Sequence, residues 1–188
     1  MCKLVFDNMK QKLLEKYGGI SMGMIACYQM VEESMLKELL EKNNEELFDE
    51  IEELQEEDEA VFDIDKLWDG LHFLLTNSTA TEPIEGNPLS EAIVGMKNFR
   101  EDEDADYIAY IFPERVQAIL EALKDFDIER AVEDFQPEKF AKQDIYPNIW
   151  VTEMKEELQE ELEESFNGLR SFYEEAEQQG MGVIVSIY

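Results

Sequence analysis

The chain has 188 residues, a length that suits one domain and leaves little room for a second. Hydrophobic residues make up 44% and aromatic residues 11%, so the chain has enough apolar surface for a packed core and is expected to fold. Its 46 acidic and 16 basic residues give a formal net charge of −30. That charge repels phosphate backbones and anionic lipids, so direct binding to nucleic acid or to a membrane is not expected.

The cysteine content and the N-terminal sequence favour a cytoplasmic location. Cys2 and Cys27 are the only cysteines, and Cys27 lies in an apolar stretch where a buried, unreactive thiol is usual. The first residues do not resemble a signal peptide, and no apolar run approaches the roughly 20 residues that cross a bilayer. The cytoplasm is therefore the simplest location.

Residues 1–21 are expected to be an N-terminal extension to a domain that covers residues 22–188. Their apolar residues have near-helical spacing up to Gly18 and Gly19, which suits a short helix. An alternative is that two adjacent glycine codons encode a purine-rich ribosome-binding sequence just upstream of Met22. We therefore expect natural translation to begin at Met22.

The first half of the domain predicts one strand followed by three helices. Residues 23–30 are almost entirely apolar and predict a buried strand. Apolar residues spaced by three and four predict helices over residues 31–43, 45–55 and 63–77. The acidic run 56–59 is expected to be an exposed helix end or a loop.

The middle of the chain alternates between loops, short helices and a strand. Residues 78–87 contain Thr, Pro and Gly and predict a surface loop, and Pro88 is then well placed to begin a helix over 88–94. An acidic loop is expected over residues 100–106. It is followed by a strand over residues 107–112.

The last part of the chain is predominantly helical. Pro113 begins one predicted helix, and residues 127–143 predict one or two short helices interrupted at Pro137. The longest helix is expected over residues 151–178, and a strand over 183–188 ends the chain. Because the strands are few and nearly continuously apolar, helices must cover them. The predicted fold is one α+β domain, mostly helical, with a small sheet of about three strands.

Several segments, in this order, resemble the YfbM-like family of bacterial proteins of unknown function. They are residues 22–28 (MGMIACY), 64–75 (IDKLWDGLHFLL), 88–95 (PLSEAIVG), 144–147 (DIYP) ahead of Trp150, and the closing helix and strand. The resemblance covers residues 22–188 and implies a single α+β domain of bacterial or phage origin. It implies no activity.

One polar constellation has the residue types of an acid–base site. Asp65, Asp69, His72 and Thr76 fall within a stripe about 60° wide on a helix, and His72 is the only histidine. A carboxylate near an imidazole favours its charged form, which suits an acid or base role for Asp65, Asp69 and His72. The competing interpretation is structural: Asp65 caps the helix, and His72 bonds a neighbouring backbone group.

A second set of residues is a weaker candidate for ligand binding. Ser90 and Glu91 lie near a helix start, where free N–H groups attract anions. Trp68, Tyr146 and Trp150 would then line the same pocket. In the alternative, the tryptophans anchor the core and Ser90 caps the helix.

The sequence predicts no metal site and no cofactor. One histidine and two separated cysteines do not form the usual zinc patterns, and residues 101–106 lack the ligand spacing of a calcium loop. The glycine pairs lack the spacing of a phosphate-binding loop.

Two main hypotheses about function remain, and a third is weaker. The first is a non-enzymatic binding protein, of the inhibitor or immunity type, for a basic partner, since the surface is acidic and no complete catalytic set is present. The alternative is a small-molecule binding or hydrolytic enzyme site around Asp65, Asp69 and His72. Mimicry of DNA by surface carboxylates is a third, weaker option.

Overall fold

A single antiparallel sheet forms the centre of the computed structural model, which describes residues 23–57, 61–100 and 107–188. Within these ranges the sheet has five strands in the order β2-β1-β5-β4-β3. The strands are β1 (Ala26–Val31), β2 (Phe62–Asp63), β3 (Lys97–Asn98), β4 (Tyr107–Ile111) and β5 (Gly182–Ile187). All neighbouring strands are antiparallel. The α+β class is confirmed.

The prediction of about three strands was wrong, because it missed β2 and β3 at the two edges of the sheet. Tyr28 pairs with Phe62 in β2, and Ala109 pairs with Asn98 in β3. Each of these strands has two residues. A two-residue strand is too short to show an alternation of apolar and polar side chains, so only the pairing partner reveals it.

Both faces of the central strands are buried. Tyr28, Ala109 and Val185 belong to the larger hydrophobic core, whereas Ile108 and Ile184 belong to a smaller one. Alternate residues of a strand point to opposite faces, so the two cores lie on opposite sides of the sheet. Every residue of β5 is buried, which explains why its sequence is apolar apart from Ser186.

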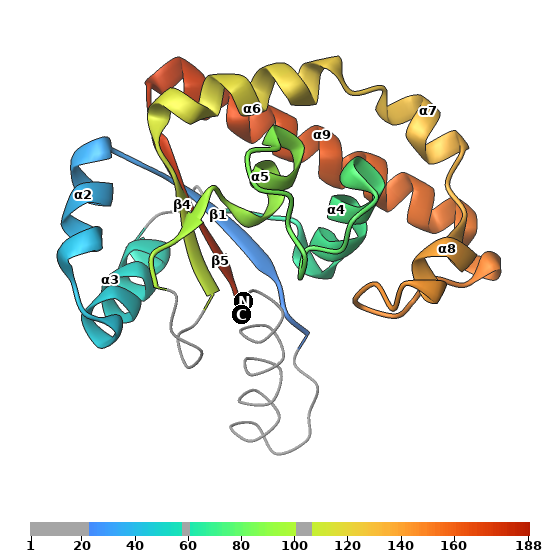
Figure 1. Ribbon diagram of the computed structural model, residues 1–188, viewed down its shortest axis with the longest axis horizontal. Helices are drawn as coiled ribbons and strands as arrows, with labels where there is room; N and C mark the ends of the chain where they lie inside the picture. The colour runs from blue at the N-terminus through green and yellow to red at the C-terminus, as the bar shows by residue number, and fades with distance from the viewer. Residues whose placement is uncertain (1–22, 58–60, 101–106) are drawn as a thin grey trace.

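Helices cover both faces (Figure 1). The smaller core is closed by α2 (Glu33–Glu41) and α3 (Asn44–Glu57). Helices from the rest of the chain surround the larger core; these are α4 (Trp68–Thr76), α5 (Pro88–Val94), α6 (Pro113–Asp125), α7 (Ile128–Glu133), α8 (Pro137–Lys142) and α9 (Lys155–Gln179). Two short 3-10 helices, η1 (Asp65–Leu67) and η2 (Thr152–Met154), precede α4 and α9.

The single helix predicted over residues 63–77 is divided in the structure. Asp63 ends β2, η1 follows, and the α-helix begins only at Trp68. Asp65 has φ 45°, in the left-handed region, which a continuous right-handed helix does not contain. The regular stripe therefore does not extend from α4 back to Asp65.

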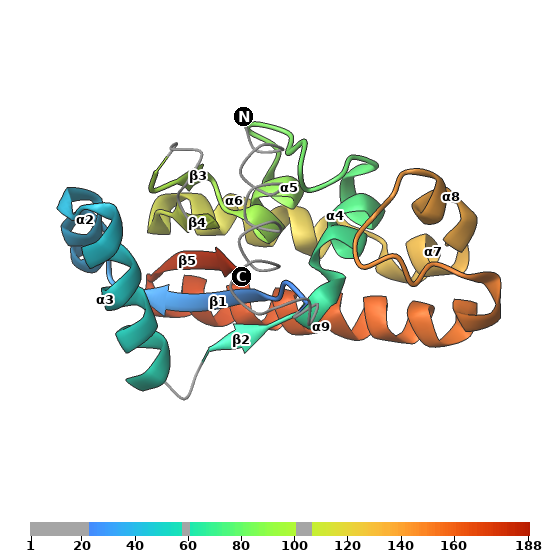
Figure 2. The ribbon, with the colours of Figure 1, turned by 90° about the horizontal axis from the view of Figure 1, so that it is seen from below.

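Helix α9 is longer than the sheet that it covers. Its 25 residues span about 37 Å, whereas a six-residue strand spans about 20 Å. The part of α9 that extends beyond the strands packs against α7 and α4 (Figure 2). The predicted apolar stripe is buried along the whole helix, from Leu158 to Ala176.

Some predictions concern residues that the structure does not describe. The extension over residues 1–21 with its start at Met22, the end of the acidic run 56–59, and nearly all of the acidic loop 100–106 lie outside the described ranges. Across the ranges that are described, none of the helices combines the length and apolar character needed to span a bilayer.

Gly70 allows the closest approach between α4 and Trp150. A Cβ atom at this position would overlap the six-membered ring of the Trp150 indole. Gly70→Ala would stabilise an ordinary exposed helix, but here we expect overpacking to lower the free energy of unfolding by about 1–3 kcal/mol. Urea denaturation of the variant measures this change.

The control for Gly70→Ala is a double-mutant cycle with Trp150→Phe, whose smaller ring removes the overlap. We expect Gly70→Ala to destabilise the Trp150→Phe background much less than the wild type. Equal destabilisation in both backgrounds would show that the indole is not the cause.

Candidate functional site

His72 occupies the centre of the predicted constellation, and it is sealed inside the protein. Its exposed fraction is 0%, and its Nδ1 lies 2.8 Å from the carbonyl oxygen of Ser78. A carbonyl only accepts, so Nδ1 carries the proton and Nε2 accepts the hydroxyl hydrogen of Ser90, whose Oγ is 2.8 Å away. Burial lowers the pKa of His72 to about 4, partly opposed by the Ser78 hydrogen bond. The imidazole is therefore neutral at pH 7.

Asp69 does not pair with His72. Its Oδ1 accepts the backbone N–H of Ala80 at 2.7 Å, and its Oδ2 accepts that of Tyr146 at 2.9 Å. Burial raises the pKa of this carboxyl group, and the two backbone hydrogen bonds oppose the rise. Asp69 thus connects α4 to two loops that are far apart in the sequence.

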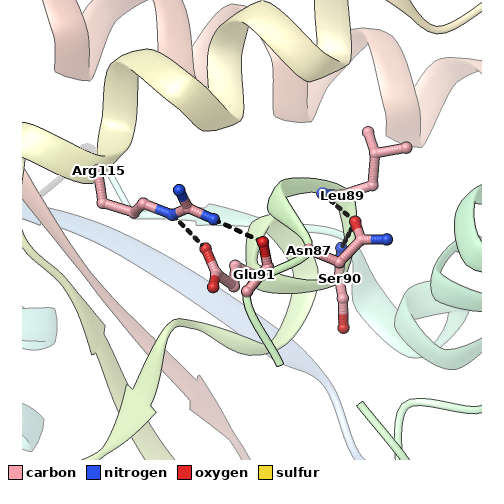
Figure 3. A network of polar contacts seen from close by, with 6 residues as sticks. Asn87, Leu89, Ser90, Glu91 and Arg115 are labelled. Carbon is pink, nitrogen blue, oxygen red and sulfur yellow. Dashed lines mark hydrogen bonds and ion pairs between the residues drawn. The ribbon is translucent and has the colours of Figure 1, made fainter. Parts of the chain in front are cut away.

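Ser90 is also enclosed, with 1% of its surface exposed. Its Oγ accepts the backbone N–H of Ile84 at 3.0 Å in addition to bonding His72. Ser90 is not the helix cap: Asn87 is, since its Oδ1 accepts the N–H groups of Leu89 and Ser90 (Figure 3). Those N–H groups are therefore not available to an anion.

Glu91 is held by an arginine from α6. Its Oε2 lies 2.5 Å from Nε of Arg115, and Arg115 also donates to the carbonyl oxygen of Gly86 at 2.9 Å (Figure 3). Glu91 has an exposed fraction of 6%, so this carboxylate is nearly buried and needs the guanidinium as its partner.

These polar residues share one structural effect, which is to fix the loop over residues 77–87. Side chains of α4, α5 and α6 hold it at four backbone groups, in Ser78, Ala80, Ile84 and Gly86. A loop lacks partners of its own for such groups, so buried side chains have to supply them. The geometry supports the structural interpretation of His72, which bonds a neighbouring backbone group. For Ser90 the predicted capping role was wrong, because its hydroxyl bonds His72 and the loop at Ile84 instead.

The predicted aromatic residues are packing anchors. Trp68 is 1% exposed, stacks on Tyr146 at a centroid distance of 5.6 Å and donates from Nε1 to the carbonyl oxygen of Met24. Trp150 is 3% exposed, packs against Phe140 and donates from Nε1 to the carbonyl oxygen of Ile145. Neither tryptophan offers a free face to a ligand.

Asp65 is separated from the other two catalytic candidates. It is exposed on η1, whereas Asp69 and His72 are buried. Its charge acts instead on α9: burial raises the pKa of Glu161, and the charges of Glu157, Asp65 and Glu164 raise it further. The three predicted catalytic residues therefore do not converge on one site.

Two other features were missed by the sequence analysis. One is this group of carboxylates across η1 and α9. The other is a polar cleft beside Lys139 and Lys142 of α8. The lysines stand three residues apart in an acidic chain, which was the available signal. In the parts of the chain that the structure describes, no group of three or more His, Cys, Asp or Glu residues is arranged to hold a metal ion.

Comparison with known proteins establishes the family. A model described as a domain of unknown function, DUF1877, matches residues 22–186. The chain belongs to the DUF1877 family. This confirms the YfbM-like resemblance, because protein YfbM of Escherichia coli (strain K12) is 28% identical over 132 residues, which are 70% of this chain and 78% of that protein.

A solved structure gives the same fold as this DUF1877 protein. The crystal structure of YfbM from Escherichia coli, described as a protein of unknown function, superposes with a TM-score of 0.73 at 24% identity. The match covers 87% of this chain and 99% of the YfbM chain. At this identity the likeness concerns the fold alone.

The buried His72 predicts a specific dependence of stability on pH. Its pKa in the folded protein, about 4, lies below the ordinary value of 6.5, so between these values the unfolded state binds more protons. The contribution of neutral His72 is complete above pH 6.5 and is lost as the pH falls towards 4, by about 3 kcal/mol in total. Urea denaturation of the wild type and His72→Gln across this range measures it: the stability advantage of the wild type should shrink as the pH falls.

Two controls separate this effect from the many carboxyl groups. The carboxyl groups titrate in both proteins, so their contributions cancel when the stability of His72→Gln is subtracted from that of the wild type. If this stability difference stayed constant between pH 6.5 and 4, the prediction would be wrong. NMR titration of His72 in Asp69→Asn tests for pairing. We expect its pKa to stay low, whereas a further fall would indicate that Asp69 does stabilise the imidazolium.

Proposed function

We propose that this protein is a non-enzymatic binding protein, of the inhibitor or immunity type, that recognises a basic partner through carboxylates of η1 and α9. The observation that carries the proposal is that Asp65, Glu157 and Glu164 all lie near enough to Glu161 for their charges, after burial, to raise its pKa. We call these four residues the acidic cluster. Two elements contribute to it, so it is a product of the tertiary structure.

The acidic cluster contains repulsion that the protein itself does not relieve. Burial and the charges of its three neighbours together raise the pKa of Glu161. All four residues are exposed, and among the described residues none of them forms an ion pair. A cationic side chain from a partner would reduce this repulsion and gain favourable charge interactions.

The helix dipole does not account for the whole cluster. Acidic residues stabilise the first turn of a helix, and Glu157 is in that turn of α9. Glu161 and Glu164 lie one and two turns further on, where the dipole has little effect. The repulsion that Asp65, Glu157 and Glu164 exert on Glu161 therefore has no compensating local benefit, which supports a role in binding.

The enzyme alternative has less support. The hydroxyl of Ser90 and Nε2 of His72 form the hydrogen bond that a nucleophile forms with its general base. Both side chains are buried, so a substrate has no access to them. Asp69 uses both oxygens on backbone amides. Asp65 faces α9 carboxylates. A hydrolytic site around Asp65, Asp69 and His72 would need an open cleft on which these groups converge.

The proposal predicts that binding depends on the acidic cluster and on salt. We expect immobilised protein to retain a basic protein from native-host lysate at low salt and release it as salt is raised. Replacing Glu157, Glu161 and Glu164 with Gln should lower retention on the order of tenfold, because long-range attraction and contact pairs are both lost. Mass spectrometry of the eluate identifies the protein, and titration calorimetry with the purified partner measures affinity.

The matched control removes the same charge elsewhere. Glu129, Glu133 and Glu177 are exposed glutamates on α7 and on the other end of α9, and their replacement with Gln also removes three negative charges. This control should bind like the wild type. If both triple variants lost the same retention, the loss would be due to net charge and not to the acidic cluster. The absence of any salt-sensitive partner would refute the proposal.

A further inference from the structure

A cleft of about 280 Å³ lies between the C-terminal end of α4, the loop that follows it, and α8. Figures 1 and 2 both show α4 and α8 as neighbours at the end of the molecule away from α2 and α3. Phe73 of α4 and Asn77, which follows its last residue, line the cleft together with Lys139 and Lys142 of α8. The cleft is distinct from the acidic cluster, whose residues do not line it.

The two lysines give this cleft an unusual local charge. The chain has only 16 basic residues against 46 acidic ones, yet two of them line one cleft. In the described part of the chain neither Lys139 nor Lys142 has a carboxylate within ion-pair distance, although Lys37, Lys42 and Lys124 each do. Cations in the last turn of α8 stabilise its dipole, but that role does not require two lysines on a cleft wall.

The other lining residues add hydrogen-bond donors and an apolar surface. Asn77 and Gln143 carry side-chain amides that bond no described residue, so their N–H groups can donate to a ligand. Phe73 supplies an apolar edge and is itself fixed by Phe140, at a centroid distance of 4.8 Å. Glu82 is the one carboxylate among the lining residues, so the two lysines still leave their summed charge positive.

The loop side of the cleft is held in place before any ligand arrives. Ser78 lines the cleft, and its carbonyl oxygen is bonded by His72. Its N–H donates to Thr76 Oγ1 at 3.1 Å, and its hydroxyl donates to the carbonyl oxygen of Glu82 at 2.8 Å. A wall that is already ordered loses little conformational entropy when a ligand binds. The buried network around His72 therefore has the effect of shaping this cleft.

We propose that this cleft binds a small anionic molecule that carries a carboxylate or phosphate group next to an apolar or aromatic part. The anionic group lies between Lys139 and Lys142 and accepts from the amide of Gln143. The apolar part lies against Phe73. The net charge of −30 disfavours anions in general, so the two lysines provide local attraction where an anion is otherwise repelled.

NMR titration of the full chain tests the proposal, with phenyl phosphate, benzoate and inorganic phosphate as probes. We expect saturable shifts of the backbone amides of Ser78, Thr79 and Gln143. Phenyl phosphate should bind more tightly than inorganic phosphate because it adds the contact with Phe73. Comparison of phenyl phosphate with benzoate distinguishes a phosphate site from a carboxylate site.

Charge-matched variants make the test specific. Lys139→Gln with Lys142→Gln should weaken binding of the preferred probe by at least about tenfold, because both charge-assisted contacts are lost. Lys97→Gln with Lys124→Gln removes the same charge elsewhere and should change affinity by less than about twofold. Shifts that do not saturate, that lie outside the cleft, or that persist in the first variant would overturn the proposal.

Discussion

The two-sided burial of β5 determines the rest of the architecture. A strand with no exposed residue has to be covered on both faces, so α2 and α3 close one side and the α9 layer closes the other. Helix α9 leads directly into β5 and extends well beyond it. The part of its apolar stripe that lies beyond the sheet needs other partners to be buried, and α4 and α7 provide them. The helical end of the molecule follows from this difference in length.

That helical end contains the buried polar side chains that fix the loop over residues 77–87. Helices α4 and α5 have nine and seven residues, and a long loop joins them. Such a loop has few internal hydrogen bonds, so Asp69, His72, Ser90 and Arg115 supply them from the neighbouring helices. A buried network of this kind is stable only when nearly all of its members are bonded, and these are. The network holds the loop over residues 77–87 in one conformation, whereas apolar burial alone would only keep the loop close to the core.

Charge is distributed unevenly over the same end of the molecule. Glutamates of α9 meet Asp65 on one side, and two lysines of α8 line a cleft elsewhere. In a chain with a net charge of −30, an acidic surface needs no special explanation, but a cluster in which burial and neighbouring carboxylates together raise the pKa of Glu161 does. Lys139 and Lys142 are the opposite exception, because they add positive charge beside a cleft and form no ion pair with any residue that the structure describes. Both exceptions arise where elements distant in sequence meet.

The sequence by itself determined the α+β class, the three long strands, most of the helices and the family, because each depends on residues close in the chain. Periodicity located α9, and Pro88 marked the first residue of α5. Helical spacing allowed Asp69 to contact His72, but the sequence could not show which other groups of the fold would hydrogen-bond these two side chains instead. Asp69 instead bonds Tyr146, 77 residues away, and His72 bonds Ser90, 18 residues away. Only tertiary packing decided those partners, the two-residue edge strands and the cleft, since burial makes each polar group take the partner that the fold brings nearest.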